Sequence, residues 1–341
     1  MIGNEQATVR ADIVRRGWPV PLRHSRATER AARNPASRRS IVVALVANVV
    51  VAAAKLVAGL TTGSSAMLAE AFHSAADSLN VVLLGVSLRR SRQPADVEHP
   101  LGYGGARFLW AFLAAISSFL IGGCLSIALS VHDLLHGSVV GRFSVAWIVL
   151  AVAALADGSA LVQTLRQARR EAAFWGRSTI DYLRHTTDPT LRALAVEDSA
   201  ALAGIAIAAA GLLVHQLGGP AESDAIASLL IGLLLAATAV GLARPLAELL
   251  IGKSIPRDRL QTAHAILADS PGIDQVLTMH AAYAAPQEVI LAAKVHPAAG
   301  QTGEQLGELL DELDHRLRDA LPEIAEVFID VTAHRSPADG S

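Results

Sequence analysis

Long apolar stretches alternate with short polar segments along most of the sequence. A helix needs roughly 20 predominantly apolar residues to cross a bilayer, and six stretches reach about that length. The pattern therefore predicts six membrane-spanning helices, at residues 41–60, 67–88, 108–131, 145–165, 194–217 and 226–250. The second and the fifth carry ionisable side chains, which are rare in segments that cross a membrane.

The pattern changes at about residue 254, where the apolar runs become short. A helix is predicted around 260–267, and two strands at 275–283 and 288–296, joined by a turn at Ala285-Pro286. Residues 302–323 predict a second helix, because Thr302 and Gln305 form a capping box and leucines repeat along one face. A third strand at 326–331 completes an αββαβ order, which predicts a small α+β domain of ferredoxin-like type.

These elements divide the chain into four predicted parts. An Arg-rich N-terminal tail, expected to be disordered, covers 1–39, and an all-α six-helix transmembrane domain covers 40–252. A cytoplasmic C-terminal domain covers 253–335, and a disordered tail covers 336–341. Because a domain of this size is marginal alone, pairing of the C-terminal domain with a second copy would stabilise it.

Positive charge alternates between the segments that connect the predicted helices. The N-terminal tail has nine arginines, the second connection (89–107) has four and the fourth (166–192) has six. The first and fifth connections have no lysine or arginine, and the third has only Arg142. Because cytoplasmic connections carry the excess of lysine and arginine, both termini are predicted to be cytoplasmic. Six buried helices of a soluble protein would not produce this alternation.

Composition agrees with a membrane protein. Hydrophobic residues make up 52% of the chain and charged residues only 18%, whereas soluble domains have about 25% charged residues. The many small residues suit helices that pack closely in lipid. The single cysteine, Cys124, excludes an internal disulfide and any metal site built from several thiolates.

Ionisable residues inside the predicted spans are the candidates for function. His73 and Asp77 are four residues apart, so a helix places both on one face. They offer one nitrogen and up to two oxygens, which is half of a tetrahedral site for a divalent metal. Glu197 and Asp198 in the fifth span are candidates for the other half, although neighbours on a helix point about 100° apart.

Other polar residues at membrane depth either contribute to function or have a purely structural role. A single intramembrane carboxylate or amide often serves as a hydrogen-bond partner between helices. The residues concerned are Asn48, Glu70, Asn80, Asp157 and Asp224. Lys55 in the first span is expected either to extend its ammonium group toward the membrane surface or to pair with an acidic neighbour.

The segments around these residues resemble those of the cation diffusion facilitator family. GSSAMLAEAFHSAADSLN resembles the family's second-helix signature, and EHPLGYGGARFLWAF resembles the following loop and the start of the third helix. LRALAVEDSAALAG and SDAIASLLIGLLL resemble its fifth and sixth helices. The resemblance extends from about residue 38 to residue 335 and includes the family's cytoplasmic dimerisation domain. It implies a homodimeric antiporter that exchanges a divalent cation for protons, typically moving zinc or a related transition metal out of the cytosol.

The resemblance also implies a metal site. The family's second-helix ligand pair falls on His73 and Asp77, and its fifth-helix pair, a histidine and an aspartate four residues later, falls on Leu194 and Asp198. Because the histidine is absent here, the adjacent Glu197 is the candidate fourth ligand. One imidazole with three carboxylates still fits Zn²⁺, the first expectation for the substrate, but it is friendlier than a two-histidine site to Mn²⁺, Fe²⁺ or Co²⁺.

Weaker candidates lie outside the spans. Some family members hold a second ion in the loop after the second helix, and the corresponding positions here are Asp96, His99 and Tyr103. The alternative is a turn organised by Pro94 and Pro100. The C-terminal domain offers further donors, which are either metal ligands or ordinary surface residues: His280, His296, His315, Asp330 and His334.

Together these patterns predict a secondary transporter rather than an enzyme. We expect an integral membrane protein of a bacterial-type plasma membrane that exports a divalent metal by alternating access at the His/carboxylate site. Divalent cations, protons, membrane lipid and a second copy of the chain are the expected partners, and nucleic acid is not. A membrane-anchored metal sensor or scaffold remains an alternative. A membrane metal-dependent enzyme is the other, although the sequence has no H-E-x-x-H, G-x-S-x-G or P-loop motif.

Overall fold

The computed structural model describes residues 36–137, 141, 143–174, 178–185, 189–220 and 222–332. The tails expected at 1–39 and 336–341 therefore lie outside the described residues, except for 36–39. Those four residues are helical and open the first described helix.

All six predicted spans are helical. They correspond to α3 (Ala36–Thr62), α4 (Ser65–Arg90), a third helix in three parts, α7 (Phe143–Phe174), α9 (Pro189–Gln216) and α10 (Ser223–Leu250). The third helix consists of α5 (Ala106–Ser117), a π-helical segment η1 (Ser118–Cys124) and α6 (Leu125–His136). A short helix, α8 (Thr179–His185), precedes α9.

Five of these helices are long and apolar enough to cross a membrane, by length and composition. They are Ser65–Arg90, Ala106–His136, Phe143–Ala173, Leu191–Gln216 and Ser223–Leu250. The described part of α3 contributes a shorter apolar segment, Asn48–Thr62. The chain is thus an integral membrane protein with five candidate spans, and the crossing of the membrane by α3 stays a prediction.

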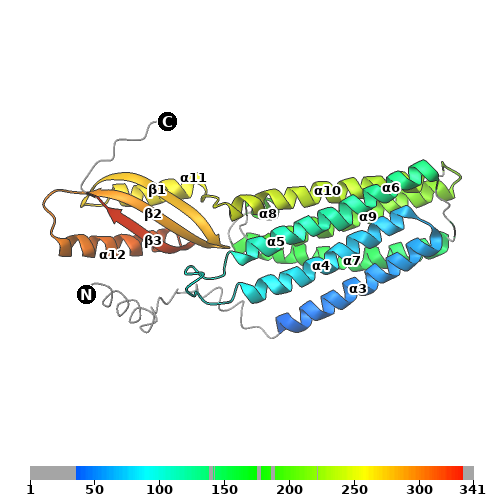
Figure 1. The fold of residues 1–341 in the computed structure, drawn as a ribbon, viewed down its shortest axis with the longest axis horizontal. Helices are drawn as coiled ribbons and strands as arrows, with labels where there is room; N and C mark the ends of the chain where they lie inside the picture. The colour runs from blue at the N-terminus through cyan, green and yellow to red at the C-terminus, as the bar shows by residue number, and fades with distance from the viewer. Residues whose placement is uncertain are drawn as a thin grey trace, which may run out of the picture. The chain divides into compact units, whose positions relative to one another are not determined.

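The helix α4 lies at the centre of the bundle, where it packs against α3, α5, η1, α6, α9 and α10 (Figure 1). Small residues allow this close packing, as expected for helices in lipid. At Gly211 of α9, an added Cβ would lie 2.5 Å from the Cβ of Ala227 on α10, so only glycine fits there. Met67 of α4, Ile205 of α9 and Ile231 of α10 belong to one buried apolar cluster.

A buried carboxylate joins α10 to the beginning of α4. Asp224 accepts hydrogen bonds from the hydroxyl groups of Ser64 and Ser65, at 2.6 and 2.9 Å, and from the backbone N–H of Ala66 at 3.2 Å. The negative charge lies at a helix N-terminus, where the helix dipole and free N–H groups stabilise an anion. The structural role considered for Asp224 is therefore confirmed, and this end of the bundle is held together.

The C-terminal segment has the predicted αββαβ order. Its elements are α11 (Arg257–Ala268), β1 (Ile273–Ala285), β2 (Glu288–Pro297), α12 (Gly303–Ala320) and β3 (Ile324–Val331). The central strand β2 pairs antiparallel with β1 and parallel with β3. Leu291 and Val295 of β2 pack in one core with Leu267 of α11 and with Leu313 and Leu317 of α12. The predicted fold class is confirmed, whereas the domain limits stay a prediction.

The start of α12 provides a test of this local structure. The capping box is present, because the Thr302 side chain accepts a hydrogen bond from the Gln305 N–H and the Gln305 side chain accepts one from the Thr302 N–H. We expect Thr302→Ala to weaken the first turn by about 1 kcal/mol, which corresponds to roughly fivefold faster amide exchange there. Hydrogen-exchange mass spectrometry of the full chain measures this. Thr278→Ala, at an exposed strand position, is the control, and equal exchange in both variants would contradict the role of the cap.

Candidate metal centre

Four polar residues form a row along one face of α4. Glu70, His73, Asp77 and Asn80 are spaced three or four residues apart, which repeats one helical face. Glu70, His73 and Asn80 are buried, and Asp77 is half-buried. A row of this kind is costly inside a membrane unless its members pair or face water, so each contact needs an explanation.

The row contains buried atoms without hydrogen-bond partners. The Nε2 of His73 lies 3.4 Å from Oδ2 of Asp77, which is longer than an ordinary hydrogen bond. Among the described residues, His73 Nε2, Asp77 Oδ1, Glu70 Oε1 and Asn80 Oδ1 are buried and have no hydrogen-bond partner. Buried polar atoms are normally paired, and exceptions often mark a functional site or an ion.

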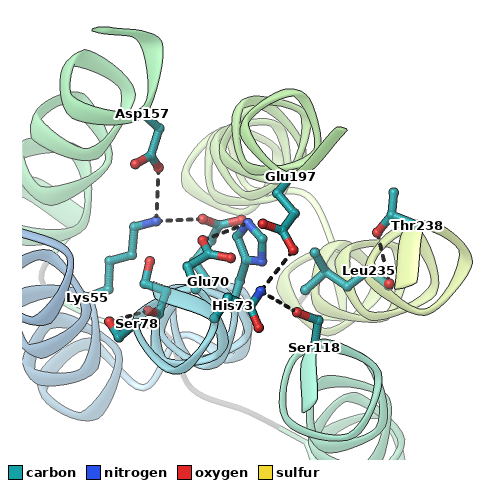
Figure 2. A network of polar contacts seen from close by, with 12 residues as sticks. Lys55, Glu70, His73, Ser78, Ser118, Asp157, Glu197, Leu235 and Thr238 are labelled. Atoms are coloured by element: carbon teal, nitrogen blue, oxygen red, sulfur yellow. Dashed lines mark hydrogen bonds and ion pairs between the residues drawn. The ribbon is translucent and has the colours of Figure 1, made fainter. Parts of the chain in front are cut away.

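The two carboxylates of α9 point to different neighbours. Glu197 accepts a hydrogen bond of 2.8 Å from Asn80 Nδ2, which also donates to the Ser118 hydroxyl of η1 at 2.9 Å (Figure 2). Asp198 instead accepts a hydrogen bond of 2.7 Å from the Thr164 hydroxyl of α7. The divergence follows from the angle of about 100° between neighbours on a helix.

A cavity of about 570 Å³ lies beside the carboxylates of Glu197 and Asp198. Asp77, Glu197 and Asp198 line it together with Leu194 and Asp157, and further lining residues come from α3, α5 and α10. Its lining reaches Ser87 near the end of α4, Arg107 at the start of α5 and Leu246 near the end of α10. These residues all belong to the end of the bundle predicted to be cytoplasmic, opposite the end that Asp224 holds together.

The structure thus brings three of the four predicted ligands to one cavity. His73 contacts Asp77 but is not among the lining residues. In the part of the chain that the structure describes, no three His, Cys, Asp or Glu side chains converge closely enough to hold one metal ion. In this conformation Asn80 and Thr164 bind the carboxylates of α9, and the four-ligand shell is not assembled.

A buried lysine joins three helices beside this site. Figure 2 shows the Lys55 side chain reaching from α3 toward Asp157 of α7 and Glu70 of α4. Its Nζ lies 2.9 Å from Glu70 Oε2 and 3.5 Å from Asp157 Oδ2, and Lys55 and Glu70 are both fully buried. On its other side Glu70 abuts α9, because a Cβ added at Gly204 would lie 2.2 Å from Glu70 Oε1. Pairing of Lys55 with an acidic neighbour is confirmed.

Three residues at the site carry no signal in the sequence: Thr164, Ser118 and Arg107. Hydroxyl groups in apolar helices are common, and nothing local distinguishes the two that contact the site. Arg107 lies at the boundary of a predicted span, where arginine is ordinary. Only the arrangement of the helices shows that these residues contact or line the site.

The loop after α4 contains local hydrogen bonds around Asp96. Asp96 Oδ1 accepts a hydrogen bond of 2.7 Å from the His99 N–H, and Oδ2 accepts one of 2.8 Å from the Tyr103 hydroxyl. The Tyr103 hydroxyl, followed by the His99 N–H, lowers the pKa of Asp96 below its usual value. Both carboxylate oxygens therefore already have protein donors, although metal binding by Asp96 and His99 stays a prediction.

Most candidate donors in the C-terminal segment have contacts within the fold. The Nδ1 atoms of His296 and His315 lie 2.9 Å and 2.8 Å from the carbonyl oxygens of Thr332 and Asp311. Asp330 is 3.4 Å from the ammonium of Lys294. His280 is exposed on β1, and His334 lies outside the described residues. These contacts provide structural roles for three of the five candidates.

Comparison with known proteins identifies the family to which this chain is similar. The cation efflux transmembrane domain family matches residues 41–251. Metal tolerance protein C4 of Arabidopsis thaliana is 32% identical over 240 residues, 70% of this chain and 52% of that protein. The human mitochondrial proton-coupled zinc antiporter SLC30A9 is 30% identical over 233 residues, 68% of this chain and 41% of that protein. The manganese efflux system protein MneP of Bacillus subtilis is 27% identical over 239 residues, 69% of this chain and 75% of that protein.

The buried ion pair provides a stability test. Lys55→Met removes the cation but leaves the Glu70 carboxylate buried, and loss of one partner from a buried pair costs about 3–5 kcal/mol. We expect a lower midpoint of thermal unfolding in detergent, and partial recovery in the double variant Lys55→Met/Glu70→Gln. Lys253→Met is the matched control, because its partner Glu248 is exposed and exposed pairs contribute little. Unfolding of Lys55→Met at the wild-type temperature would show that the pair is dispensable.

Proposed function

The chain belongs to the cation efflux family of membrane transporters, and we propose that it exports a divalent metal ion from the cytoplasm in exchange for protons. The ion binds between α4 and α9, with His73 and Asp77 as ligands from one helix and Glu197 and Asp198 from the other. The plant and human relatives are longer than this chain, which covers 52% of the plant protein and 41% of the human protein. Activity and substrate are therefore proposed here from this chain's own residues.

One observation carries the proposal. His73 Nε2 and Asp77 Oδ1 are buried and, among the described residues, have no hydrogen-bond partner. Asp77 also lines the cavity that contains Glu197 and Asp198. An imidazole nitrogen and carboxylate oxygens are donors that first-row divalent metals accept. A bound dication would satisfy the unpaired atoms and would compensate the excess of negative charge.

The donor set points to a range of metals. One imidazole with three carboxylates is a harder site than one with two imidazoles, so it accepts Zn²⁺ but also suits Mn²⁺, Fe²⁺ or Co²⁺. The names of the relatives cover part of this range, since one is a zinc antiporter and another a manganese efflux protein. We propose Zn²⁺ as the first substrate and Mn²⁺ as its principal competitor.

Coupling to protons follows from ligand chemistry. Carboxylates and imidazole bind metal only when they are deprotonated, so protons compete with the ion at the same atoms. The cavity reaches the end of the bundle predicted to be cytoplasmic, where the metal would be taken up. Asn80 and Thr164 hold Glu197 and Asp198 until the ion arrives. Rocking of helices would then expose the site to the other side, where protons replace the metal.

Assembly and location complete the proposal. We expect a homodimer in which the C-terminal αββαβ segment pairs with a second copy, because a domain of this size is marginal alone. The alternation of positive charge supports cytoplasmic termini. A bacterial-type plasma membrane is the proposed location.

Removal of a ligand tests the transport site. We expect Asp77→Ala or Asp198→Ala to lower Zn²⁺ transport by roughly 100-fold or more, because even partners outside the ligand shell are worth 10–100-fold. The measurement is metal uptake into proteoliposomes that contain an internal pH dye, so that proton movement is recorded together with the metal. Asp319→Ala, which removes an exposed carboxylate of α12, is the control and should keep both fluxes. Wild-type Zn²⁺ transport by purified Asp77→Ala would refute the assignment, whereas a sensor or scaffold would show no flux in any variant.

Leu194 tests the origin of metal preference. It lies one turn before Asp198 and lines the same cavity. Leu194→His adds an imidazole to the carboxylates, so we expect the ratio of Zn²⁺ to Mn²⁺ initial rates to rise. Leu246→His, which adds an imidazole to the cavity from α10, is the matched control. An unchanged ratio in Leu194→His would mean that position 194 does not reach the bound ion.

A further inference from the structure

A second group of potential ligands lies at the other end of the bundle, in the last turn of α6. His132 and His136 are four residues apart, and their rings stack with centroids 4.4 Å apart and an interplanar angle of 22°. Asp133 lies between them in sequence, with one oxygen 3.2 Å from His132 Nδ1. The His132 side chain is 64% exposed, so the pair is accessible from outside the protein.

The contacts of the two rings determine which nitrogen is free. His136 Nδ1 lies 2.9 Å from the His132 carbonyl oxygen. A carbonyl oxygen only accepts, so His136 Nδ1 must carry the proton. An ionised carboxylate also only accepts, so the contact with Asp133 places a proton on His132 Nδ1. In both neutral rings the lone pair is therefore on Nε2.

The contacts of the two Nδ1 atoms are those that metal-binding histidines make. Their second ring nitrogen almost always donates to a carboxylate or a backbone carbonyl, which fixes the tautomer and the orientation of the ring. Here the acceptor for His132 is a carboxylate and the acceptor for His136 is a backbone carbonyl. Helical spacing places both rings on the same face. Because the rings stack in nearly parallel planes, one ring would turn to bring both Nε2 atoms onto one ion. We propose that His132 and His136 form a second divalent-metal site, with the two Nε2 atoms as ligands and water in the remaining positions.

The chemistry of the pair selects the metal class. Two imidazoles and water suit Cu²⁺, Ni²⁺ and Zn²⁺, whereas Mn²⁺ and Mg²⁺ prefer oxygen ligands. The site therefore differs in preference from the carboxylate-rich site between α4 and α9. Asp133 does not coordinate the ion in this proposal but orients the ring of His132.

The position of the pair suggests its use. It lies in the segment that precedes Arg142, a connection with a single basic residue and thus predicted to be non-cytoplasmic. A hydrogen bond of 2.8 Å from the Gly141 N–H to the Thr62 carbonyl places this connection beside the end of α3, at the end of the bundle where Asp224 binds the start of α4. If the proposed export is correct, the pair accepts metal on the release side. Binding itself does not depend on that function.

Helix capping is the competing explanation. Histidines near a helix C-terminus can bond the last carbonyl oxygens and interact favourably with the helix dipole. In that case the pair would have no particular affinity for metals. The two explanations differ in whether both rings bind the same ion.

Electron paramagnetic resonance of Cu²⁺ separates these explanations. The sample is the purified full-length chain in detergent, without an affinity tag and with Cu²⁺ alone. We expect a signal with coupling to two imidazole nitrogens in the wild type, and loss of the two-nitrogen coupling with roughly tenfold or more weaker Cu²⁺ binding in His132→Gln and in His136→Gln. His315→Gln is the matched control, because its Nδ1 also contacts the carbonyl four residues earlier, and it should leave the signal unchanged.

Two further variants make the test independent of transport. Asp77→Ala should keep the two-nitrogen signal, because the site between α4 and α9 contributes only the imidazole of His73. Asp133→Asn should keep both nitrogens but weaken Cu²⁺ binding by roughly tenfold, as expected for the loss of an orienting partner. Wild-type signal and affinity in both histidine variants would leave helix capping as the only role and overturn the proposal. Loss of the two-nitrogen signal in Asp77→Ala would overturn it as well, since the signal would then belong to the intramembrane site.

Discussion

Charge at membrane depth must be neutralised inside the protein, and the arrangement of α3, α4, α7 and α9 depends on this constraint. An unpaired ion in hydrocarbon costs several kcal/mol. Lys55 meets the constraint for Glu70 and Asp157, which lie on two different helices. Because the ammonium group occupies those two carboxylates, it fixes α3 against both helices. His73 and Asp77, further along the same face of α4, keep buried atoms that have no hydrogen-bond partner in the part of the chain that the structure describes.

The two ends of the polar row on α4, which runs from Glu70 to Asn80, therefore have different roles. Toward its beginning, Asp224 and Lys55 bind polar groups of α4 and join this helix to α10, α3 and α7. Toward its end, Asp77 and Asn80 line a cavity, and Asn80 donates a hydrogen bond to Glu197 of α9. One end of the bundle is therefore held by buried hydrogen bonds and the other surrounds open space. Such an asymmetry is consistent with the alternating access that we propose, since one end would stay closed while the other admits the ion.

The two proposed sites differ in chemistry in a way that suits a direction of movement. Carboxylates dominate the site between α4 and α9, whereas two imidazoles form the pair at the end of α6. A metal that leaves the first site on the non-cytoplasmic side would meet softer donors there. Neither site uses Cys124, the one cysteine of the chain, so the thiolate chemistry that retains soft metals tightly plays no part.

Much of this architecture is encoded locally and could be predicted from the sequence. Runs of apolar residues predict the six helices, and the spacing of apolar residues predicts the αββαβ order. Thr302 and Gln305 predict the start of α12. The common face of His73 and Asp77 follows from helical spacing alone. Such features depend on neighbours within a few residues. Residue type already made Glu197 and Asp198 of α9 candidates for the remaining ligands, and family resemblance supported this hypothesis.

Only the tertiary structure decided which groups meet. Lys55 binds partners 15 and 102 residues away, and Asp198 binds a hydroxyl on α7 rather than a group on α4. The hydroxyl of Ser118 contacts Asn80 from a π-helical segment, which an apolar sequence does not predict. These contacts depend on which helix faces lie together, and hydropathy does not specify the faces because every span is apolar on most sides. The sequence therefore determined the elements and the candidate ligands, and packing of small residues determined the cavity and the partners of each charge.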